Sequence, residues 1–274
     1  MDWISLWPVL AAMLAAGLAA GVIAGLLGVG GGIVVVPVLE YALAFAGVDP
    51  EWRMHVAVAT SMATIVPTSL SSSRAHHSRG AVDWSLARAW APGMLAGAFA
   101  GSLLAANADA AVLTGLFGVV ALLVALKMAL PLDHLRAAPE PPRGLGGNAL
   151  AAGIGAVSSM MGIGGGTLSV PALTLSGEPI HRAVGTAAFF GLLISVPATL
   201  GYLLASTGGS LPWLTIGLVS LPGVALIAPC SMLTAPLGAR LSHGLSRRAL
   251  SLVFAAFLAV VGARMLYSTL VAAP

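Results

Sequence analysis

Long apolar runs without alternation are the feature of this sequence that most restricts its fold. They follow one another through all 274 residues, at 5–27, 32–47, 54–73, 84–106, 110–130, 147–161, 166–177, 182–205, 212–240 and 248–271. Charged residues make up only 8% of the chain, against about 25% in soluble domains. Water alone cannot solvate a folded surface with so few charges, so we expect lipid to cover most of it.

The runs predict helices rather than barrel strands. Lipid offers no hydrogen-bond partners to the backbone, so only helices and closed barrels cross it. A helix needs about 20 apolar residues to do so, and most of these runs reach that length. We therefore expect an all-α polytopic membrane protein. The runs at 32–47, 147–161 and 166–177 are shorter, and each borders a glycine cluster.

Charge and cysteine content exclude several classes of protein. The net charge of +3 indicates where loops lie in a membrane protein and gives no reason to expect a nucleic-acid partner. Cys230 is the only cysteine, which rules out an intramolecular disulfide or a cysteine-based metal site. We expect no cofactor, no metal and no enzymatic activity. The N-terminus lacks a basic segment, so 5–27 is predicted to be a retained span.

Landmarks in the first half of the chain recur in order in the second half. The cluster at 28–32 returns at 162–166. Further pairs follow in the same order: Pro37 with Pro171, His55 with His181, Thr60 with Thr186, Gly101 with Gly238, and Phe117 with Phe254. A charged, proline-rich stretch separates the halves. We expect a first membrane repeat at 1–130, a cytoplasmic linker at 131–145, and a second membrane repeat at 146–274.

Equivalent loops carry opposite charge patterns. The loop after the third run has Arg74, Arg79 and Arg88 nearby, whereas its counterpart at 206–211 has no charge. The loop at 107–109 has no Lys or Arg, whereas its counterpart carries Arg240, Arg247 and Arg248. Basic loops favour the cytoplasmic side, so equivalent loops are predicted on opposite faces.

This charge pattern is typical of inverted-topology repeats. We expect about five helical segments in each repeat, with glycine-broken or re-entrant half-helices. Both termini are predicted outside the cytoplasm. Arg53, Arg182 and Arg264 are not explained by this pattern.

The two glycine clusters are the main candidates for a substrate site. Glycine costs about 1 kcal/mol relative to alanine inside a helix, so each cluster is expected to break one. A glycine turn that opens a helix presents free N–H groups and the positive end of the helix dipole, which suits anions. The candidate substrate-binding residues are Gly28, Gly30, Gly31, Gly32, Gly162, Gly164, Gly165 and Gly166.

Close helix packing is the alternative explanation for glycine in a membrane protein. We expect it for two stripes with a spacing of four residues, which are Gly17, Gly21 and Gly25, and Gly93, Gly97 and Gly101.

Polar residues within the apolar runs extend the candidate site. Thr60, Ser61 and Thr186 are further substrate-binding candidates because hydroxyls donate to oxyanions. The alternative is a hydrogen bond to the preceding turn of the same helix.

His55, His181 and Arg182 are candidates for a proton or anion relay, since histidine titrates near neutral pH. Their alternative role is to begin helices at the membrane surface, with Glu178 as an ion-pair partner.

Three motifs carry a family resemblance. GLLGVGGGIVVVP at 25–37, MMGIGGGTLSVP at 160–171 and HRAVGTA at 181–187 resemble the sulfite exporter TauE/SafE family of membrane proteins. The resemblance implies secondary transport of small anions across a bacterial cytoplasmic (inner) membrane. The first half reads HVAVATS at the third motif and lacks a counterpart of Arg182 beside His55.

We therefore predict a secondary transporter that exports a small anion, such as sulfite or an organosulfonate, by alternating access. Proton coupling is part of this hypothesis. The alternatives are a channel-like permease for another small solute and a membrane assembly protein without transport activity. The expected partners are the anion and the lipid bilayer, and a homo-oligomer is left open.

Overall fold

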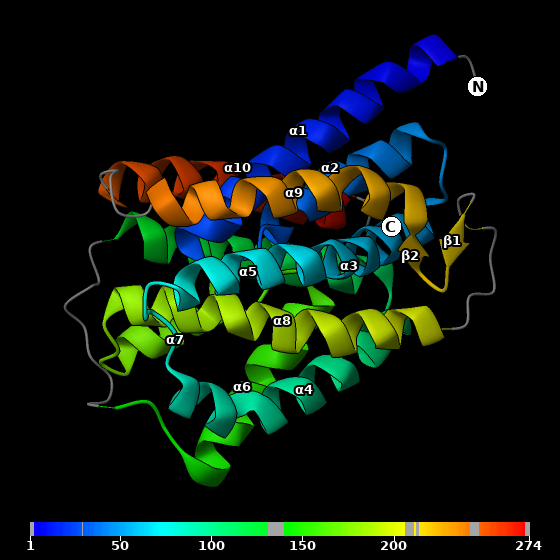
Figure 1. Cartoon of the computed structure of the whole chain (residues 1–274). Helices are drawn as coiled ribbons and strands as arrows, with labels where there is room; N and C mark the ends of the chain where they lie inside the picture. The colour runs from blue at the N-terminus through cyan, green and yellow to red at the C-terminus, as the bar shows by residue number, and fades with distance from the viewer. Residues whose placement is uncertain are drawn as a thin grey trace.

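The computed structural model describes residues 3–28, 30–130, 140–205, 211, 214–241 and 247–271. The described residues form ten helices, which confirms the predicted helical fold (Figure 1). They are α1 (Trp3–Leu27), α2 (Gly32–Phe45), α3 (Pro50–His77), α4 (Trp84–Ala106), α5 (Ala110–Ala129), α6 (Gly144–Met160), α7 (Gly166–Leu175), α8 (Ile180–Leu204), α9 (Leu221–Leu241) and α10 (Arg247–Val271). Five of these described helices are long and apolar enough to cross a membrane. The protein is therefore a multi-pass membrane protein.

One predicted boundary is wrong. The run at 212–240 was expected to be helical throughout, but α9 begins only at Leu221. Two short antiparallel strands precede it, β1 (Thr215–Ile216) and β2 (Val219–Ser220). Gly217 has a φ of 55°, a left-handed conformation that ends regular helix. An added Cβ there would collide with carbonyl oxygens at the end of α8, so the turn packs tightly on that helix.

The most extensive helix pairings join the two halves of the chain. These pairs are α1 with α9, α4 with α6, and α5 with α10 (Figure 1). Helices α3 and α8 contact each other, and each also packs against helices from both halves of the chain. The predicted glycine packing is confirmed. An added Cβ on Gly21 would collide with Ser231 of α9, and one on Gly97 with the Ala152 carbonyl of α6. Small residues therefore let these helix backbones approach closely.

Both predicted helix breaks at the glycine clusters are also confirmed. In the first half α1 ends at Leu27 and α2 begins at Gly32, and in the second half α6 ends at Met160 and α7 begins at Gly166. In each half the helix before the break is followed by a shorter one, because left-handed glycines at the break cannot continue a helix.

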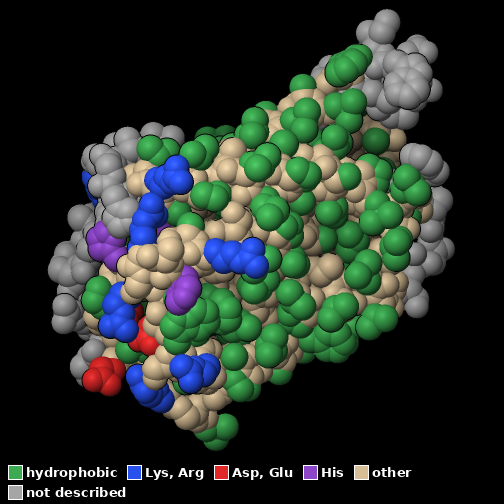
Figure 2. All heavy atoms as spheres, viewed as in Figure 1, with side chains coloured by type: hydrophobic (Ala, Val, Ile, Leu, Met, Phe, Trp, Pro, Cys, Tyr) green, Lys and Arg blue, Asp and Glu red, His purple; other side chains and the backbone are tan. Residues whose placement is uncertain are grey.

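Basic side chains gather at one end of the bundle, shown at the left of Figure 2, while hydrophobic side chains cover most of the rest of that face. Two polar contacts of arginine side chains lie at this end of the bundle. Arg79 donates to the Ala239 carbonyl at the end of α9, at 2.6 Å, and Arg182 pairs with Asp83 just before α4. Arg182, which the loop charges left unexplained, therefore lies at the basic end. Most of the linker, at 131–139, falls outside the described residues.

Candidate functional site

The two glycine turns meet in the middle of the bundle. An added Cβ on Gly30 would lie 2.8 Å from the Cα of Gly164, and one on Gly32 would collide with the Gly162 carbonyl. Gly30 also has a φ of 77°, which residues with a side chain rarely adopt. The chain therefore brings together, backbone against backbone, the two clusters that the sequence placed far apart.

Each turn also reaches into the opposite half in the same way. An added Cβ on Gly28 would lie 2.5 Å from the Val184 carbonyl oxygen of α8. One on Gly162, the counterpart of Gly28, would lie 2.9 Å from the Cα of Val58 on α3. Gly28 and Gly162 share a φ of 67°. Since Val58 and Val184 are themselves counterparts in the repeat, the arrangement occurs twice.

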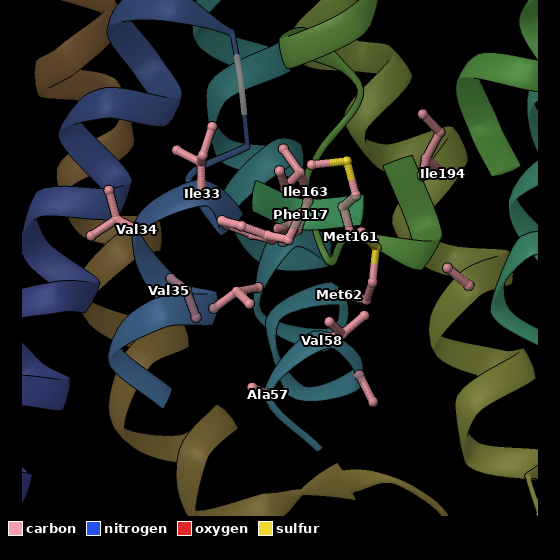
Figure 3. Packing of buried hydrophobic residues seen from close by; sticks show 14 of the residues in the cluster. Ile33, Val34, Val35, Ala57, Val58, Met62, Phe117, Met161, Ile163 and Ile194 are labelled. Carbon is pink, nitrogen blue, oxygen red and sulfur yellow. The ribbon is translucent and has the colours of Figure 1, made fainter. Parts of the chain in front are cut away.

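Apolar side chains close the site. Figure 3 shows Ile33, Met62, Phe117, Met161 and Ile163 gathered around the turns in one cluster, and each is at most 1% exposed. The first N–H groups of α2 and α7 have no partner within their own helices. In such surroundings they interact more strongly with an anion than they would in water. Free N–H groups at a helix start in such surroundings have the chemistry that suits an anion.

The two turns are not copies of each other. Gly31, which precedes α2, has a φ of 78°, whereas its counterpart Gly165 has a φ of −53°. The second turn thus enters its helix through an ordinary right-handed residue, so the backbone conformation before the two short helices differs.

Thr60 and Thr186 make the same hydrogen bond in the two halves. Thr60 Oγ1 accepts from the Ser220 N–H at 2.9 Å, and Thr186 Oγ1 accepts from the Asp83 N–H at 2.9 Å. Each threonine thereby holds the start of a helix, α9 or α4. Ser61 is the predicted hydroxyl that contacts a glycine turn directly, since it donates to the Gly162 carbonyl at 2.7 Å.

The predicted relay residues do not form one cluster. His55 is 3% exposed, and its Nδ1 and Nε2 lie 2.9 Å and 2.8 Å from the carbonyl oxygens of Glu51 and Ala108. Its counterpart His181 is exposed. His55 contacts Ala108, which follows the C-terminal end of α4. Arg182 contacts Asp83, which precedes the N-terminal end of the same helix. The two sites are thus separated by the 23 residues of α4, about 35 Å of helix.

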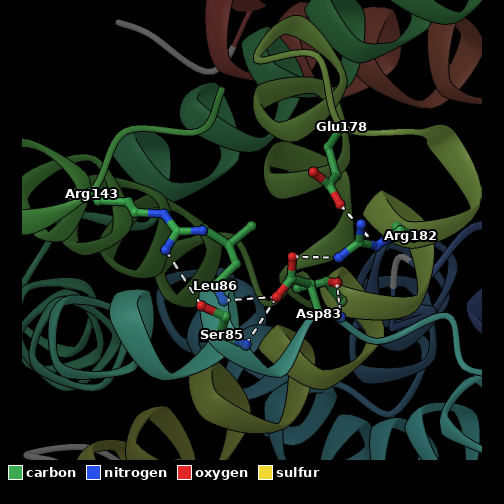
Figure 4. A network of polar contacts seen from close by, with 7 residues as sticks. Asp83, Ser85, Leu86, Arg143, Glu178 and Arg182 are labelled. Carbon is green, nitrogen blue, oxygen red and sulfur yellow. Dashed lines mark hydrogen bonds and ion pairs between the residues drawn. The ribbon is translucent and has the colours of Figure 1, made fainter. Parts of the chain in front are cut away.

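Arg182 anchors a polar network at the basic end (Figure 4). Its Nη2 lies 2.7 Å from Asp83 Oδ2, and its Nε lies 3.2 Å from Glu178 Oε1. The predicted ion pair with Glu178 is thus confirmed. Asp83 also accepts from the Ser85 and Leu86 N–H groups and so caps α4. These contacts tie the start of α8 to the start of α4.

Comparison with known proteins agrees with the sequence motifs. A sequence model of the sulfite exporter TauE/SafE family matches residues 13–265. The chain belongs to this family. A relative from Haemophilus influenzae is 34% identical over 88% of this chain and 91% of its own length, and one from Methanocaldococcus jannaschii is 28% identical over 88% and 89%. One from Bacillus subtilis is 27% identical over 88% and 92%. All three are named probable membrane transporter proteins, and no solved structure matches the chain significantly.

Sequence reasoning missed most of a set of buried hydroxyls in this TauE/SafE family member, and of that set it considered only Ser158, which precedes the second glycine cluster. Six hydroxyl oxygens in the described part of the chain are buried and have no hydrogen-bond partner: Ser69, Ser158, Thr167, Ser169, Ser195 and Thr199. The signal was present in the motifs, because GGGTLSVP in the second half has hydroxyls where GGGIVVVP in the first half has none.

Glu40 was also overlooked, although it is the one carboxylate within the run at 32–47. It lies on α2 within electrostatic reach of Arg264 and Arg53. Arg264 also stacks over the neighbouring Tyr41 ring at 3.9 Å. This contact accounts for Arg264, which the loop charges left unexplained.

Proposed function

We propose that this membrane transporter is a secondary transporter that exports a small anion, such as sulfite or an organosulfonate, by alternating access. The observation that carries the proposal is the contact between Gly30 and Gly164. It joins two helix-opening turns whose N–H groups suit an anion. The proposed binding residues are the eight glycines of the two clusters, with Thr60, Ser61 and Thr186 nearby.

Alternating access follows from the closed state of this centre. The glycines of both turns in the described residues are buried, so an anion enters only after the turns separate on one side. We propose that residues 1–130 and 146–274 are inverted-topology repeats joined by the linker at 131–145. The repeated threonine contacts at Ser220 and Asp83 support this proposal. Exchange of conformation between such repeats would open the centre to each side in turn.

We further propose that the protein lies in the bacterial cytoplasmic membrane with both termini outside the cytoplasm, since basic side chains favour the cytoplasmic face. Cysteines at positions 208 and 244 test this orientation. In a Cys230→Ser background, Gly208→Cys should react with an impermeant thiol reagent added outside intact cells. Gly244→Cys should react only after the membrane is opened. Labelling of both positions from the same side would contradict the inverted arrangement.

Proton coupling is the part of the proposal that rests on His55. Both of its ring nitrogens face carbonyl oxygens, and only the doubly protonated ring can donate to both. The ring therefore links α3 to the loop after α4 through the Ala108 carbonyl oxygen.

Flux through purified protein in proteoliposomes tests the function directly. We expect uptake of sulfite or methanesulfonate down an imposed gradient, at a rate at least about tenfold above protein-free vesicles. The rate should also respond to a proton gradient. Trapped unlabelled anion should accelerate uptake of labelled anion, because a carrier exchanges substrate. Flux without such exchange would favour a channel-like permease, and no flux with either anion would contradict the assignment of these substrates.

A further inference from the structure

We propose that, within the site formed by the two glycine clusters, the second turn makes the strongest contacts to the anion, through the Gly165 amide and the hydroxyls of Ser69, Thr167 and Ser169, and that this uncharged subsite selects singly charged oxyanions. The inference rests on the proposed function but deepens it, because it makes the two turns unequal.

Three unpartnered hydroxyls point to an occupant. Ser69 on α3 is 1% exposed, and on α7 Thr167 is 3% and Ser169 is 0% exposed. None of the three oxygens has a hydrogen-bond partner within the described parts of the chain. Most buried polar groups in proteins are paired, and each exception asks for an explanation, such as a ligand or water. Thr167 and Ser169 lie in the first turn of α7, the end that carries the positive pole of its dipole.

Gly191 on α8 shows that Ser69 faces the same spot as the turn. An added Cβ on Gly191 would collide with Ser69 Oγ and lie 3.9 Å from the Gly165 nitrogen. One on Gly165 would in turn lie 3.1 Å from the Gly191 nitrogen. The hydroxyl from α3 and the amide of the turn therefore border the same bare stretch of α8.

The first turn carries hydrocarbon at three of the equivalent positions, whereas the counterpart of Ser69 is Ser195, a buried hydroxyl that also has no hydrogen-bond partner among the described residues. The counterpart of Gly191 is Ile65, whose Cγ2 and Cδ1 lie 3.3 Å and 2.9 Å from added Cβ positions on Gly30 and Gly32. The counterparts of Thr167 and Ser169 are Ile33 and Val35, which are at most 1% exposed. Apolar side chains offer an anion nothing, so the second turn has more binding groups than the first, three unpartnered hydroxyls against one.

The absence of charge from the four subsite residues determines which anions fit. The cost of moving an ion out of water rises with the square of its charge in the Born treatment, so a doubly charged ion needs about four times the compensation of a singly charged one. Four neutral donors cannot supply this for a dianion. We therefore expect hydrogen sulfite and organosulfonates to bind, and sulfate, a dianion at neutral pH, to be excluded.

Isosteric replacement of the Thr167 hydroxyl tests the subsite. Thr167→Val should raise the half-saturating concentration of methanesulfonate at least about tenfold, because a hydrogen bond to a charged group is lost. It should leave the melting temperature unchanged or raised, because no protein partner is lost. Ser69→Ala should do the same from α3. The matched control is Thr174→Val, also on α7, whose hydroxyl donates to the Val170 carbonyl at 2.9 Å. It should lower the melting temperature and leave the affinity unchanged.

Ligand-induced stabilisation provides a readout independent of transport. Methanesulfonate should raise the melting temperature of the purified wild-type protein and of Thr174→Val, but not that of Thr167→Val. Sulfate should stabilise none of them. If wild-type protein carries methanesulfonate and all variants bind it equally, the subsite is overturned while the proposed function stands. If the wild-type protein binds methanesulfonate but does not transport it, and Thr167→Val abolishes that binding, the subsite is supported and the transport function is overturned. Equal stabilisation by sulfate would overturn the charge selection.

Discussion

Gly30→Ala is expected to reduce transport by about 100-fold or more, whereas Gly47→Ala should remain close to the wild-type rate. Both glycines have a φ of 77°, so both variants carry the same backbone strain of about 1–2 kcal/mol. The two variants differ in the room that surrounds the added methyl group. The new Cβ at Gly30 would lie 2.8 Å from Gly164, whereas nothing lies within 4 Å at Gly47. Initial rates of anion uptake into proteoliposomes measure the effect.

The amount of folded protein in the membrane must be compared for both variants, since strain alone lowers it equally. If Gly30→Ala and Gly47→Ala transport at similar rates, the contact between the turns is not central to the transport cycle. A parallel loss of folded protein and activity in Gly30→Ala alone would assign that contact to stability.

Gly97→Leu should lower the free energy of unfolding by about 3 kcal/mol or more, at the upper end of the usual range for an overpacked core. An added Cβ on Gly97 would collide with the Ala152 carbonyl and lie 2.7 Å from its Cα, so leucine must push α4 and α6 apart. Gly153→Leu on α6 should have little effect, because nothing lies within 4 Å of that position. Unfolding of the purified proteins in detergent measures both.

A small effect of Gly97→Leu, comparable with that of Gly153→Leu, would show that the helices separate at little cost. The close approach of α4 to α6 would then contribute less to stability than its geometry indicates.

The helices were predictable because their signals are local. Asp49 accepts from the Glu51 N–H and Pro50 opens α3, so the residues that begin this helix lie beside it in sequence. The glycine breaks are local too. The strands before α9 were missed because Leu214 is left-handed, with a φ of 58°, and leucine gives no hint of such a turn.

The candidate site was only partly predictable because its contacts are long-range. Motif spacing identified Gly30 and Gly164 as counterparts, but only the folded chain shows that they touch. Likewise His55 and His181 look equivalent in sequence, yet His55 is buried through its contact with Ala108, which sequence proximity cannot reveal. The difference between Ile65 and Gly191 is visible in the sequence, but only the structure shows that each residue packs against a glycine turn.

The pairing of α1 with α9, α4 with α6, and α5 with α10 has a consequence for how such a gene could arise. Each half leaves its main helix surfaces uncovered until the other half is present. With the inverted arrangement proposed above, a half-length ancestor would have needed a second, oppositely oriented copy of itself. Fusion of two such copies into one chain would ensure that each membrane receives both orientations in equal numbers. It would also free each copy to change separately, as Gly191 and Ile65 have done.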